Sequence, residues 1–381
     1  MEPIGRSQVF LYLRRLALEH AITLITFEKA SDWADVGRRN ALKNEVAAAG
    51  IRWAPLRYHK TPTVAATAFD VGTAVFVGVY LTLRDRIEIV HARSYVPAIV
   101  ALVLKRLLAV KFIFDMRGFW PDQKRDCGAW RQGSHVYRFA KWFESKFLKS
   151  ADMVVSLTDA AVRVLRVRPE AVSQTFAVIP TCVDLDLFVG PRTVLKPVSE
   201  FVVGVVGSVT VSYLFDDMLR AFAQIQAIRS DAKLKVLNRD EHPFVWDRAR
   251  RAGIDESQIE VRSVEHALMP GEMAGMDIAV FFLKPYPSLK AVAPTKLAEL
   301  LASGVPCLCN AGIGDFDTIL SAEGTGIVLS DLTPASLAKG AQEVVNLAGQ
   351  PEVRRRCRES AQRRFSLEEG VRRYDAIYSS L

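Results

Sequence analysis

The chain has 381 residues, half of them hydrophobic and 24% charged, which is the composition of a globular protein with more than one domain. Its five scattered cysteines form no C-x-x-C pair, which argues against a disulfide framework or a zinc site and favours a reducing compartment. The net charge of +8 is uneven, because residues 1–185 hold 27 Lys/Arg against 17 Asp/Glu and residues 186–381 hold 23 against 25. A basic N-terminal half indicates an anionic partner, such as nucleic acid, an acidic membrane leaflet or a phosphorylated acceptor, and a solvated surface without a partner is the alternative.

The start of the chain lacks the basic and apolar regions of a signal peptide, so we expect a cytoplasmic protein. The most membrane-like segment is Val64–Leu83, which is close to spanning length. It contains Asp70 and two glycines and has basic residues at both ends. We interpret it as a buried amphipathic helix rather than a membrane span.

Short β-branched runs alternate with helical patterns along the chain, which predicts βαβ units and parallel sheets. The expected strands of the first half are Ile22–Phe27, Ile51–Pro55, Ile87–His91, Phe112–Phe114, Met153–Leu157 and Phe176–Ile179. Those of the second half are Phe201–Val206, Lys233–Leu237, Ile259–Val261, Ile278–Phe282 and Pro306–Cys309. The expected helices include Val9–Ala17, Ala98–Leu108, Val136–Leu148, Leu214–Ile228, Thr295–Ala302 and the basic tail from Val353 to Leu381.

The stretch Val189–Pro197 has two prolines, a glycine and no periodicity, so it reads as a linker between two α/β domains. We expect an N-terminal domain over residues 1–190 and a C-terminal domain over 191–364. The final helix, residues 365–381, is expected to pack back toward the N-terminal domain.

In open α/β sheets, ligands bind beyond the carboxyl ends of the strands. In the second half, Gly207-Ser208-Val209-Thr210 follows a strand and offers backbone N–H groups to a phosphate. Pro294 begins a helix with Thr295 in its first turn, and Lys296 and Glu299 share one face of it. A cation there suits a diphosphate and a carboxylate suits ribose hydroxyls, although an ordinary surface ion pair has the same spacing. Asn238 follows another strand and could line a nucleobase or make a turn.

Several segments together resemble family 4 glycosyltransferases of the GT-B fold. The segment Ala293–Gly304 is similar to their P-T-K-L-x-E-Y-L-A-x-G-x-P donor helix, and Gly5-x-Ser7-Gln8-Val9 to their opening helix. Further similar segments, in the same order along the chain, are His91–Tyr95, Asp115–Gly118, Ile179–Asp184, Gly207–Leu214 and Cys309–Asp315. The resemblance implies two Rossmann-like parallel-sheet domains facing a cleft, and a retaining, metal-independent transfer from a nucleotide sugar. The expected partners are this donor and a glycan or lipid-linked acceptor, with no nucleic acid and no further cofactor. The basic N-terminal domain suits a polyprenyl-diphosphate-linked acceptor and peripheral contact with the inner leaflet, as in surface polysaccharide biosynthesis.

The chain departs from the family pattern in three places. Ser208 stands where the family has an arginine, and Tyr213-Leu214 stand near the usual lysine of the diphosphate clamp. Ala291 replaces the first member of a glutamate pair, of which Glu299 remains. With the clamp residues missing, charge compensation must come from Lys290, Lys296 and backbone amides. The N-terminal domain also lacks the family's first, central strand, and an apolar strand encoded in frame upstream of Met1 would explain this.

The expected donor-binding residues are Ser208, Thr210, Asn238, Lys290, Thr295, Lys296 and Glu299, and the expected acceptor-binding residues are Gly5, Arg6 and Arg93. The expected catalytic residues are Lys296, Asp115, Arg117 and His91. Asp115 either polarises an acceptor hydroxyl or braces its loop by pairing with an arginine, and His91 is more often a packing residue than a base.

Two D-x-D triplets, at Asp184 and at Asp315, read as a turn or cap and as a helix N-cap rather than as metal sites. The alternatives to a transferase are a catalytically impaired binding or scaffold protein and a sugar-nucleotide epimerase. A dinucleotide oxidoreductase is disfavoured because no G-x-G-x-x-G follows a strand.

Overall fold

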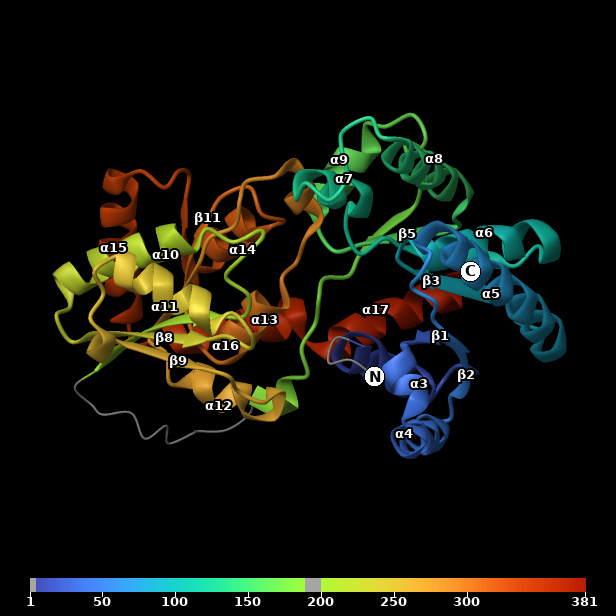
Figure 1. The fold of residues 1–381 in the computed structure, drawn as a ribbon, viewed down its shortest axis with the longest axis horizontal. Coiled ribbons are helices and arrows are strands. Elements are labelled where there is room, and N and C mark those ends of the chain that lie inside the picture. The colour runs from blue at the N-terminus through green and yellow to red at the C-terminus, as the bar shows by residue number, and fades with distance from the viewer. Residues whose placement is uncertain (1–4, 189–199) are drawn as a thin grey trace. The chain divides into compact units, whose positions relative to one another are not determined.

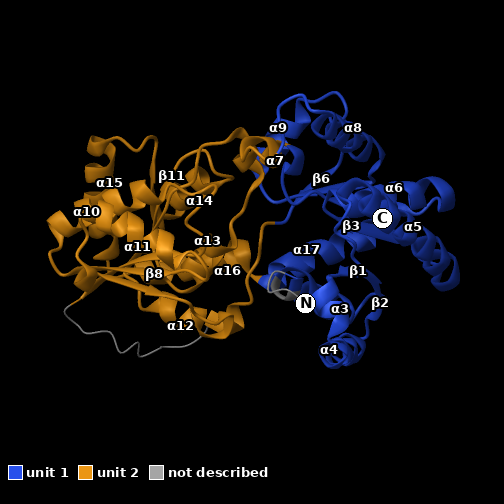
Figure 2. Cartoon of the chain, viewed as in Figure 1, with its two compact units in different colours: residues 1–121, 130–179, 367–381 blue, residues 122–129, 180–366 orange. Residues whose placement is uncertain are grey.

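A computed structural model describes residues 5–188 and 200–381, and the predicted linker at 189–197 lies outside these ranges. The described chain forms two compact units. Unit 1 comprises residues 1–121, 130–179 and 367–381, and unit 2 comprises residues 122–129 and 180–366 (Figures 1 and 2). The structure therefore divides the chain after residue 179, before the predicted boundary, and assigns residues 122–129 to unit 2 and the last helix to unit 1.

Unit 2 has one parallel sheet in the order β12-β11-β10-β7-β8-β9. Its strands are β7 (Phe201–Val206), β8 (Ala232–Leu237), β9 (Ile259–Arg262), β10 (Ile278–Phe281), β11 (Cys307–Asn310) and β12 (Gly326–Leu329). The central strand β7 is buried along its whole length, as expected for a parallel strand covered on both faces. The chain leaves β7 first toward β8 and then returns to its other side at β10, which is the strand order of a doubly wound fold.

The helices of unit 2 cover this sheet (Figure 1). They are α10 (Phe215–Ile228), α11 (His242–Arg251), α12 (Met269–Ala274), α13 (Thr295–Ala302), α14 (Phe316–Glu323), α15 (Pro334–Ala348) and α16 (Val353–Phe365), with short helices η2 (Leu185–Phe188), η3 (Glu256–Gln258), η4 (His266–Leu268) and η5 (Pro287–Ala291). α10 packs on α15, and α13 packs on α16. Arginines of the basic tail hold backbone carbonyls here, since Arg354 donates to Ala274 O and Met276 O and Arg356 donates to Gly324 O.

Unit 1 contains two separate parallel sheets among its described residues. One pairs β1 (Thr23–Glu28) with β2 (Arg52–Arg57), and the other has the order β3-β4-β5-β6, with β3 (Ile89–Arg93), β4 (Lys111–Asp115), β5 (Met153–Ser156) and β6 (Phe176–Val178). A continuous doubly wound sheet would have one more strand between β1 and β3. This division agrees with the expectation that the N-terminal domain lacks its first strand.

The helices of unit 1 are η1 (Arg6–Phe10), α2 (Leu11–Leu16), α3 (Ala30–Ala34), α4 (Val36–Ala48), α5 (Thr63–Asp85), α6 (Tyr95–Leu108), α8 (His135–Ser150), α9 (Asp159–Arg166) and α17 (Leu367–Ser380); α7 (Trp120–Asp126) runs from unit 1 into unit 2. Phe27 of β1 and Val90 of β3 pack against one apolar cluster that includes Ala74 of α5 and Leu104 of α6, so the two sheets share a core.

The segment predicted as a buried amphipathic helix is α5, and its burial is lower than predicted. Within the described residues α5 is the one helix long and apolar enough to cross a membrane by length and composition, and only 28% of its most apolar window is buried. One side packs on α6, where Gly78 lies close enough that a Cβ would be 3.0 Å from Leu104. The opposite side of α5 is also apolar, but no described element packs against it, so it is exposed.

Candidate functional site

The carboxyl end of β7 is the position in unit 2 where the strand order reverses, since β7 lies between β8 and β10. Doubly wound sheets bind their ligands at this point. The turn after β7 begins at Gly207, whose φ of +86° is readily adopted only by glycine. A Cβ on Gly207 would lie 3.2 Å from Lys296 Nζ, so the absence of a side chain lets the lysine reach this turn.

Lys296 is a partly buried cation at the N-terminus of α13. Its Nζ lies 4.0 Å from the centroid of the Tyr213 ring, an arrangement that favours a positive charge. Burial nevertheless lowers the pKa of Lys296 to about 7, against the opposing influence of Glu299, Cys309 and Glu241. Before an anion binds, the Lys296 amine is therefore only about half protonated near neutral pH.

The start of α13 adds backbone donors to this lysine. Pro294 is at the N-cap, and the N–H groups of Thr295 and Lys296 have no carbonyl partner inside the helix, whereas Leu297 N donates to Pro294 O. Glu299 lies one turn along the helix, and burial raises its pKa. Lys290 is exposed on the preceding short helix η5. The structure thus brings Thr295, Lys296 and Glu299 together with the Gly207 turn.

The turn after β7 already holds a carboxylate, that of Glu241. Its oxygens accept hydrogen bonds from Val209 N at 2.8 Å, from Ser208 Oγ at 2.9 Å, and from Thr210 Oγ1. Asn238 Nδ2 donates to Glu241 Oε2 at 2.8 Å and to Gly207 O at 3.0 Å. Partial burial would raise the pKa of Glu241, but these donors outweigh it and lower the pKa to about 2.

Sequence reasoning missed Glu241, which changes the interpretation of three predicted donor residues. Ser208, Thr210 and Asn238 lie together as expected, but in this structure their donors face a carboxylate of this chain. The contact joins positions about thirty residues apart across two strand ends. The one available indication in the sequence was an acidic residue shortly after Asn238, and such a residue is explained equally well as a solvent-exposed charge.

The candidate acceptor residues of unit 1 gather around Asp115 at the carboxyl end of β4. The Asp115 side chain is fully buried. Its Oδ2 accepts from Tyr374 Oη at 3.0 Å and from Arg93 Nη1 at 3.2 Å, and its Oδ1 lies 3.8 Å from Arg117 Nη1. Burial would raise the pKa of Asp115, but Arg117, His91 and Arg93 hold it well below its usual range. In this arrangement the Asp115 carboxylate holds together the loops that follow β3 and β4.

His91 and the arginines have further constraints. His91 Nδ1 is 2.7 Å from the hydroxyl of Tyr378, and its Nε2 is 3.6 Å from Asp115. Ser94 and Arg117, which follow β3 and β4, have φ of +77° and +54°. Such values are uncommon for residues with a side chain and concentrate at functional sites. Gly5 precedes η1, Arg6 is its first residue, and the side chain of Arg6 lies outside the described part of the chain.

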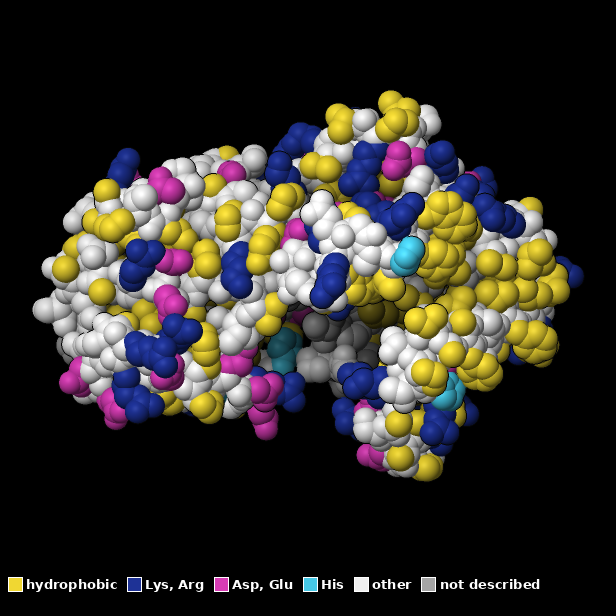
Figure 3. Space-filling model, turned by 45° about the horizontal axis from the view of Figure 1, so that its top comes forward, with side chains coloured by type: hydrophobic (Ala, Val, Ile, Leu, Met, Phe, Trp, Pro, Cys, Tyr) yellow, Lys and Arg dark blue, Asp and Glu magenta, His cyan; other side chains and the backbone are white. Residues whose placement is uncertain are grey.

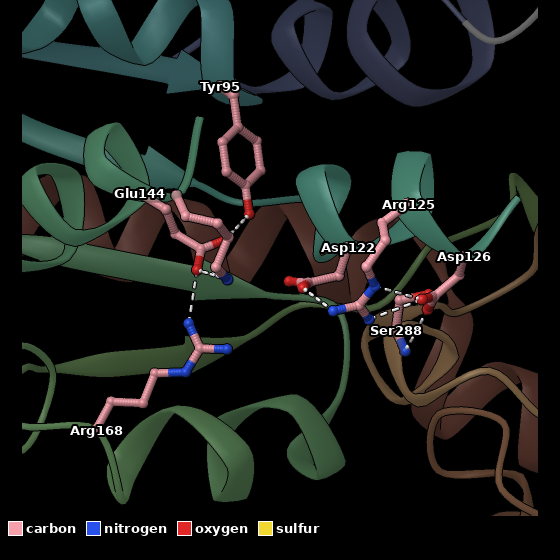
Figure 4. A network of polar contacts seen from close by, with 8 residues as sticks. Tyr95, Asp122, Arg125, Asp126, Glu144, Arg168 and Ser288 are labelled. Carbon is pink, nitrogen blue, oxygen red and sulfur yellow. Dashed lines mark hydrogen bonds and ion pairs between the residues drawn. The ribbon is translucent and has the colours of Figure 1, made fainter. Parts of the chain in front are cut away.

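Two ion-pair groups support these loops from within each unit (Figure 4). In unit 1, the buried Glu144 accepts from Tyr95 Oη and from Arg168 Nη1, each at 2.6 Å, and Tyr95 Oη lies 3.2 Å from Gly118 O. This holds the start of α6 and the loop after β4 against α8. In unit 2, Asp126 accepts from Ser288 N at 3.3 Å, which fixes the segment 122–129 to η5.

The two units, each built on parallel strands with polar groups at their carboxyl ends, define a protein of the GT-B class. Residues 10–181 match the family model of the glycosyl transferase 4-like domain. The predicted resemblance and the predicted fold class are confirmed. No curated protein sequence matches the chain.

Solved structures give the same result for the fold. The chain is similar to sucrose-phosphate synthase from Thermosynechococcus elongatus, with 13% identity, a TM-score of 0.68, and coverage of 94% of this chain and 98% of that one. HepE of Anabaena, determined in complex with UDP, has 14% identity, a TM-score of 0.69, and coverage of 97% and 96%. A glycosyltransferase from Rickettsia africae has 15% identity, a TM-score of 0.69, and coverage of 95% and 98%. At these identities the likeness establishes the fold.

Proposed function

We propose that this protein transfers a sugar from a nucleoside-diphosphate sugar to a glycan or lipid-linked acceptor. The glycosyl transferase 4-like domain and the GT-B fold support glycosyltransferase activity. The observation that carries the donor assignment is Lys296, a partly buried ammonium beside the free N–H groups of α13 and the Gly207 turn. A fixed cation and oriented N–H groups stabilise the negative charge that develops on a leaving diphosphate.

In this proposal Lys296 and Thr295 hold the leaving diphosphate, Lys290 adds positive charge, and Glu299 binds ribose hydroxyls. The resemblance implies retention of configuration without a protein nucleophile and without a metal ion. HepE has been determined in complex with UDP and with UDP-glucose, and this supports a uridine nucleotide as the first donor to test.

On the acceptor side, Arg93 and Arg117 bind a phosphate of the acceptor, and Asp115 sets the position of both guanidinium groups. His91 lies between Asp115 and Tyr378 and is the imidazole beside these groups. Two phosphate-binding arginines would suit a polyprenyl diphosphate at the inner face of the cytoplasmic membrane, and we propose a role in surface polysaccharide or glycoconjugate biosynthesis.

A second candidate function is that of a catalytically impaired binding or scaffold protein, which would bind a nucleotide sugar weakly. The position of Glu241 favours it, because this carboxylate occupies the donors of the turn that would otherwise bind phosphate. The two functions differ in turnover, since a binding protein releases no nucleotide from a nucleotide sugar.

The donor can be identified by a thermal-shift screen of nucleotide sugars. A ligand that binds only the folded protein raises its melting temperature, by an amount that grows with its concentration relative to Kd. We expect one nucleoside-diphosphate sugar to raise Tm more than the corresponding nucleoside monophosphate. Equal shifts with both ligands would remove the diphosphate from the account.

Donor binding should take up a proton above neutral pH. Lys296 has a lowered pKa of about 7 when free, and a neighbouring diphosphate raises it. Affinity should therefore fall as pH rises above 7, by up to about tenfold per pH unit, and binding at pH 8 should take up about one proton. Calorimetry in two buffers of different ionisation enthalpy measures this uptake. The same uptake in Lys296→Met would assign the proton to another group.

Replacing Glu241 with glutamine should tighten donor binding. The change removes a negative charge beside the proposed diphosphate site while keeping the shape of the side chain. Two charges about 4 Å apart in water interact by about 1 kcal/mol, so we expect a gain of about fivefold in affinity. The control is Glu260→Gln, on an exposed carboxylate of β9. Weaker binding in Glu241→Gln would mean that the carboxylate orders the turn for the donor.

A further inference from the structure

Three helices of unit 1 form one layer beside the sheet β3–β6, with α6 in contact with both α5 and α8. This layer leaves large apolar side chains uncovered. On α5 they are Val64 near its start and then Phe69, Phe76, Tyr80 and Leu83, whose steps of seven, four and three residues place these four along one side of the helix. Leu107 is exposed at the end of α6, and Val136, Phe139 and Trp142 are exposed on α8. Figure 3 shows hydrophobic side chains gathered over this unit on the face in view.

The exposed aromatic residues are concentrated in this layer. Among the described residues, the exposed Phe, Trp and Tyr side chains are Tyr58, Phe69, Phe76, Tyr80, Phe139 and Trp142. Five of these six lie on α5 and α8, and the sixth lies shortly before α5. Phe76 is 78% exposed and Trp142 is 52% exposed. Isolated exposed apolar residues are common, but a collection of aromatics on adjacent helices is typical of a binding surface.

The charged groups of the same layer are predominantly positive. Arg106 on α6 is exposed, as are Arg138 and Lys149 on α8. The only acidic residue of α8, Glu144, is buried and paired with Lys141 and Arg168, and α6 has no acidic residue.

The acidic groups of α5 are already satisfied by neighbours. Asp70 is buried against His59, and Asp85 pairs with Arg52 and Arg84. Exposed aromatic and aliphatic side chains beside unopposed cations suit a surface that is apolar within and anionic outside.

The geometry of α5 argues against a membrane-spanning role. Ala74 and Leu81 are buried, and Gly78 packs against Leu104 of α6, so one side of α5 belongs to the core of unit 1. A span would have to detach this side from the core. A helix that keeps one side in the protein can contact lipid with the other only by lying along the bilayer surface.

We propose that the α5–α6–α8 layer docks on an anionic lipid bilayer. Phe139, Trp142 and the α5 aromatics enter the interfacial region, while Arg138 and Lys149 contact lipid phosphates. This proposal rests on the proposed function in one respect: the reason for docking would be to bring the acceptor-side arginines to a lipid-linked acceptor. Binding to a bilayer that contains neither acceptor nor donor is measured independently of sugar transfer.

The test is co-sedimentation of the full chain with phosphatidylcholine vesicles that contain either no anionic lipid or about 30% phosphatidylglycerol. We expect binding to the anionic vesicles, weakened by salt, and little binding to the neutral ones. The double variant Phe139→Ser/Trp142→Ser should bind about tenfold more weakly, and Phe76→Ser should also bind more weakly. Arg138→Gln and Lys149→Gln should each lose about fivefold, the effect of about one surface charge.

Matched controls on unit 2 separate this effect from general loss of surface charge or apolar area. Leu268→Ser changes a 62% exposed leucine, and Lys339→Gln changes a 77% exposed lysine side chain, and both should bind like the unchanged protein. All variants must keep the melting temperature of the parent. Equal binding to neutral and anionic vesicles, or unaltered binding of Phe139→Ser/Trp142→Ser, would overturn the proposal. The proposal would also be overturned if the protein did not bind vesicles and instead formed a dimer in solution that Phe76→Ser dissociated.

Discussion

Replacing Lys296 with alanine should lower the turnover of sugar transfer by about 10²- to 10³-fold, the usual effect of removing one fixed donor to developing charge. The reason is its position, with Nζ against the Tyr213 ring and the Gly207 turn at the point where the strand order of unit 2 reverses. The measurement is the rate of nucleoside diphosphate release from the donor identified by thermal shift.

The fold should survive this change. Burial lowers the pKa of Lys296, which means that burying the charged ammonium costs free energy of folding. Because Lys296→Met removes this charge, it should keep or slightly raise the melting temperature. Loss of turnover together with an unchanged Tm would therefore separate a role in the reaction from a role in stability. The matched control is Lys339→Ala, on an exposed lysine of α15. Turnover within a factor of two of the parent in Lys296→Met would remove the lysine from the mechanism.

Replacing Asp115 with alanine should destabilise the protein by about 3–5 kcal/mol, because it leaves buried charged partners without their counter-ion. Arg93 and Arg117 both face this fully buried carboxylate, and Tyr374 of α17 donates to it. Denaturant unfolding measures the loss, which should appear in the transition of unit 1. Because the folded-state pKa lies below the ordinary value of 3.8, the stabilisation is complete above that value and is lost as pH falls through the folded-state pKa.

The control for Asp115 is Asp85→Ala. Asp85 also pairs with two arginines, Arg52 and Arg84, but those side chains are about half exposed and the pairs lie at the surface. We expect a change of about 1 kcal/mol or less. If Asp115→Ala were as mild as Asp85→Ala, the carboxylate would not brace the two loops, and a direct role toward the acceptor would become the better interpretation.

Periodicity predicted the strands of both units well, because parallel strands covered on two faces form continuous apolar runs such as Phe201–Val206. The strand β12 was missed because Gly326–Leu329 is short and follows a glycine-rich turn. The burial of α5 was overestimated for a related reason. The sequence pattern shows that a helix is apolar but not how many neighbouring elements cover it, and we therefore predicted too much burial for α5.

The site divides in the same way between local and distant contacts. Lys296 and the Gly207 turn could be predicted, because each is part of a local strand–turn–helix pattern. Glu241 and Tyr374 could not, since their contacts depend on the tertiary fold. Tyr374 reaches Asp115 across 259 residues of sequence, and only the packing of α17 in unit 1 brings them together.

The central claim, transfer of sugar from a nucleotide sugar, is tested most directly by nucleotide release. The purified protein is incubated with the donor found by thermal shift, with and without a polyprenyl-diphosphate-linked acceptor, and the released nucleoside diphosphate is quantified. The account predicts release that the acceptor accelerates and that Lys296→Met lowers by about 10²- to 10³-fold. A donor that binds and raises Tm, but yields no nucleoside diphosphate with or without acceptor, would contradict it.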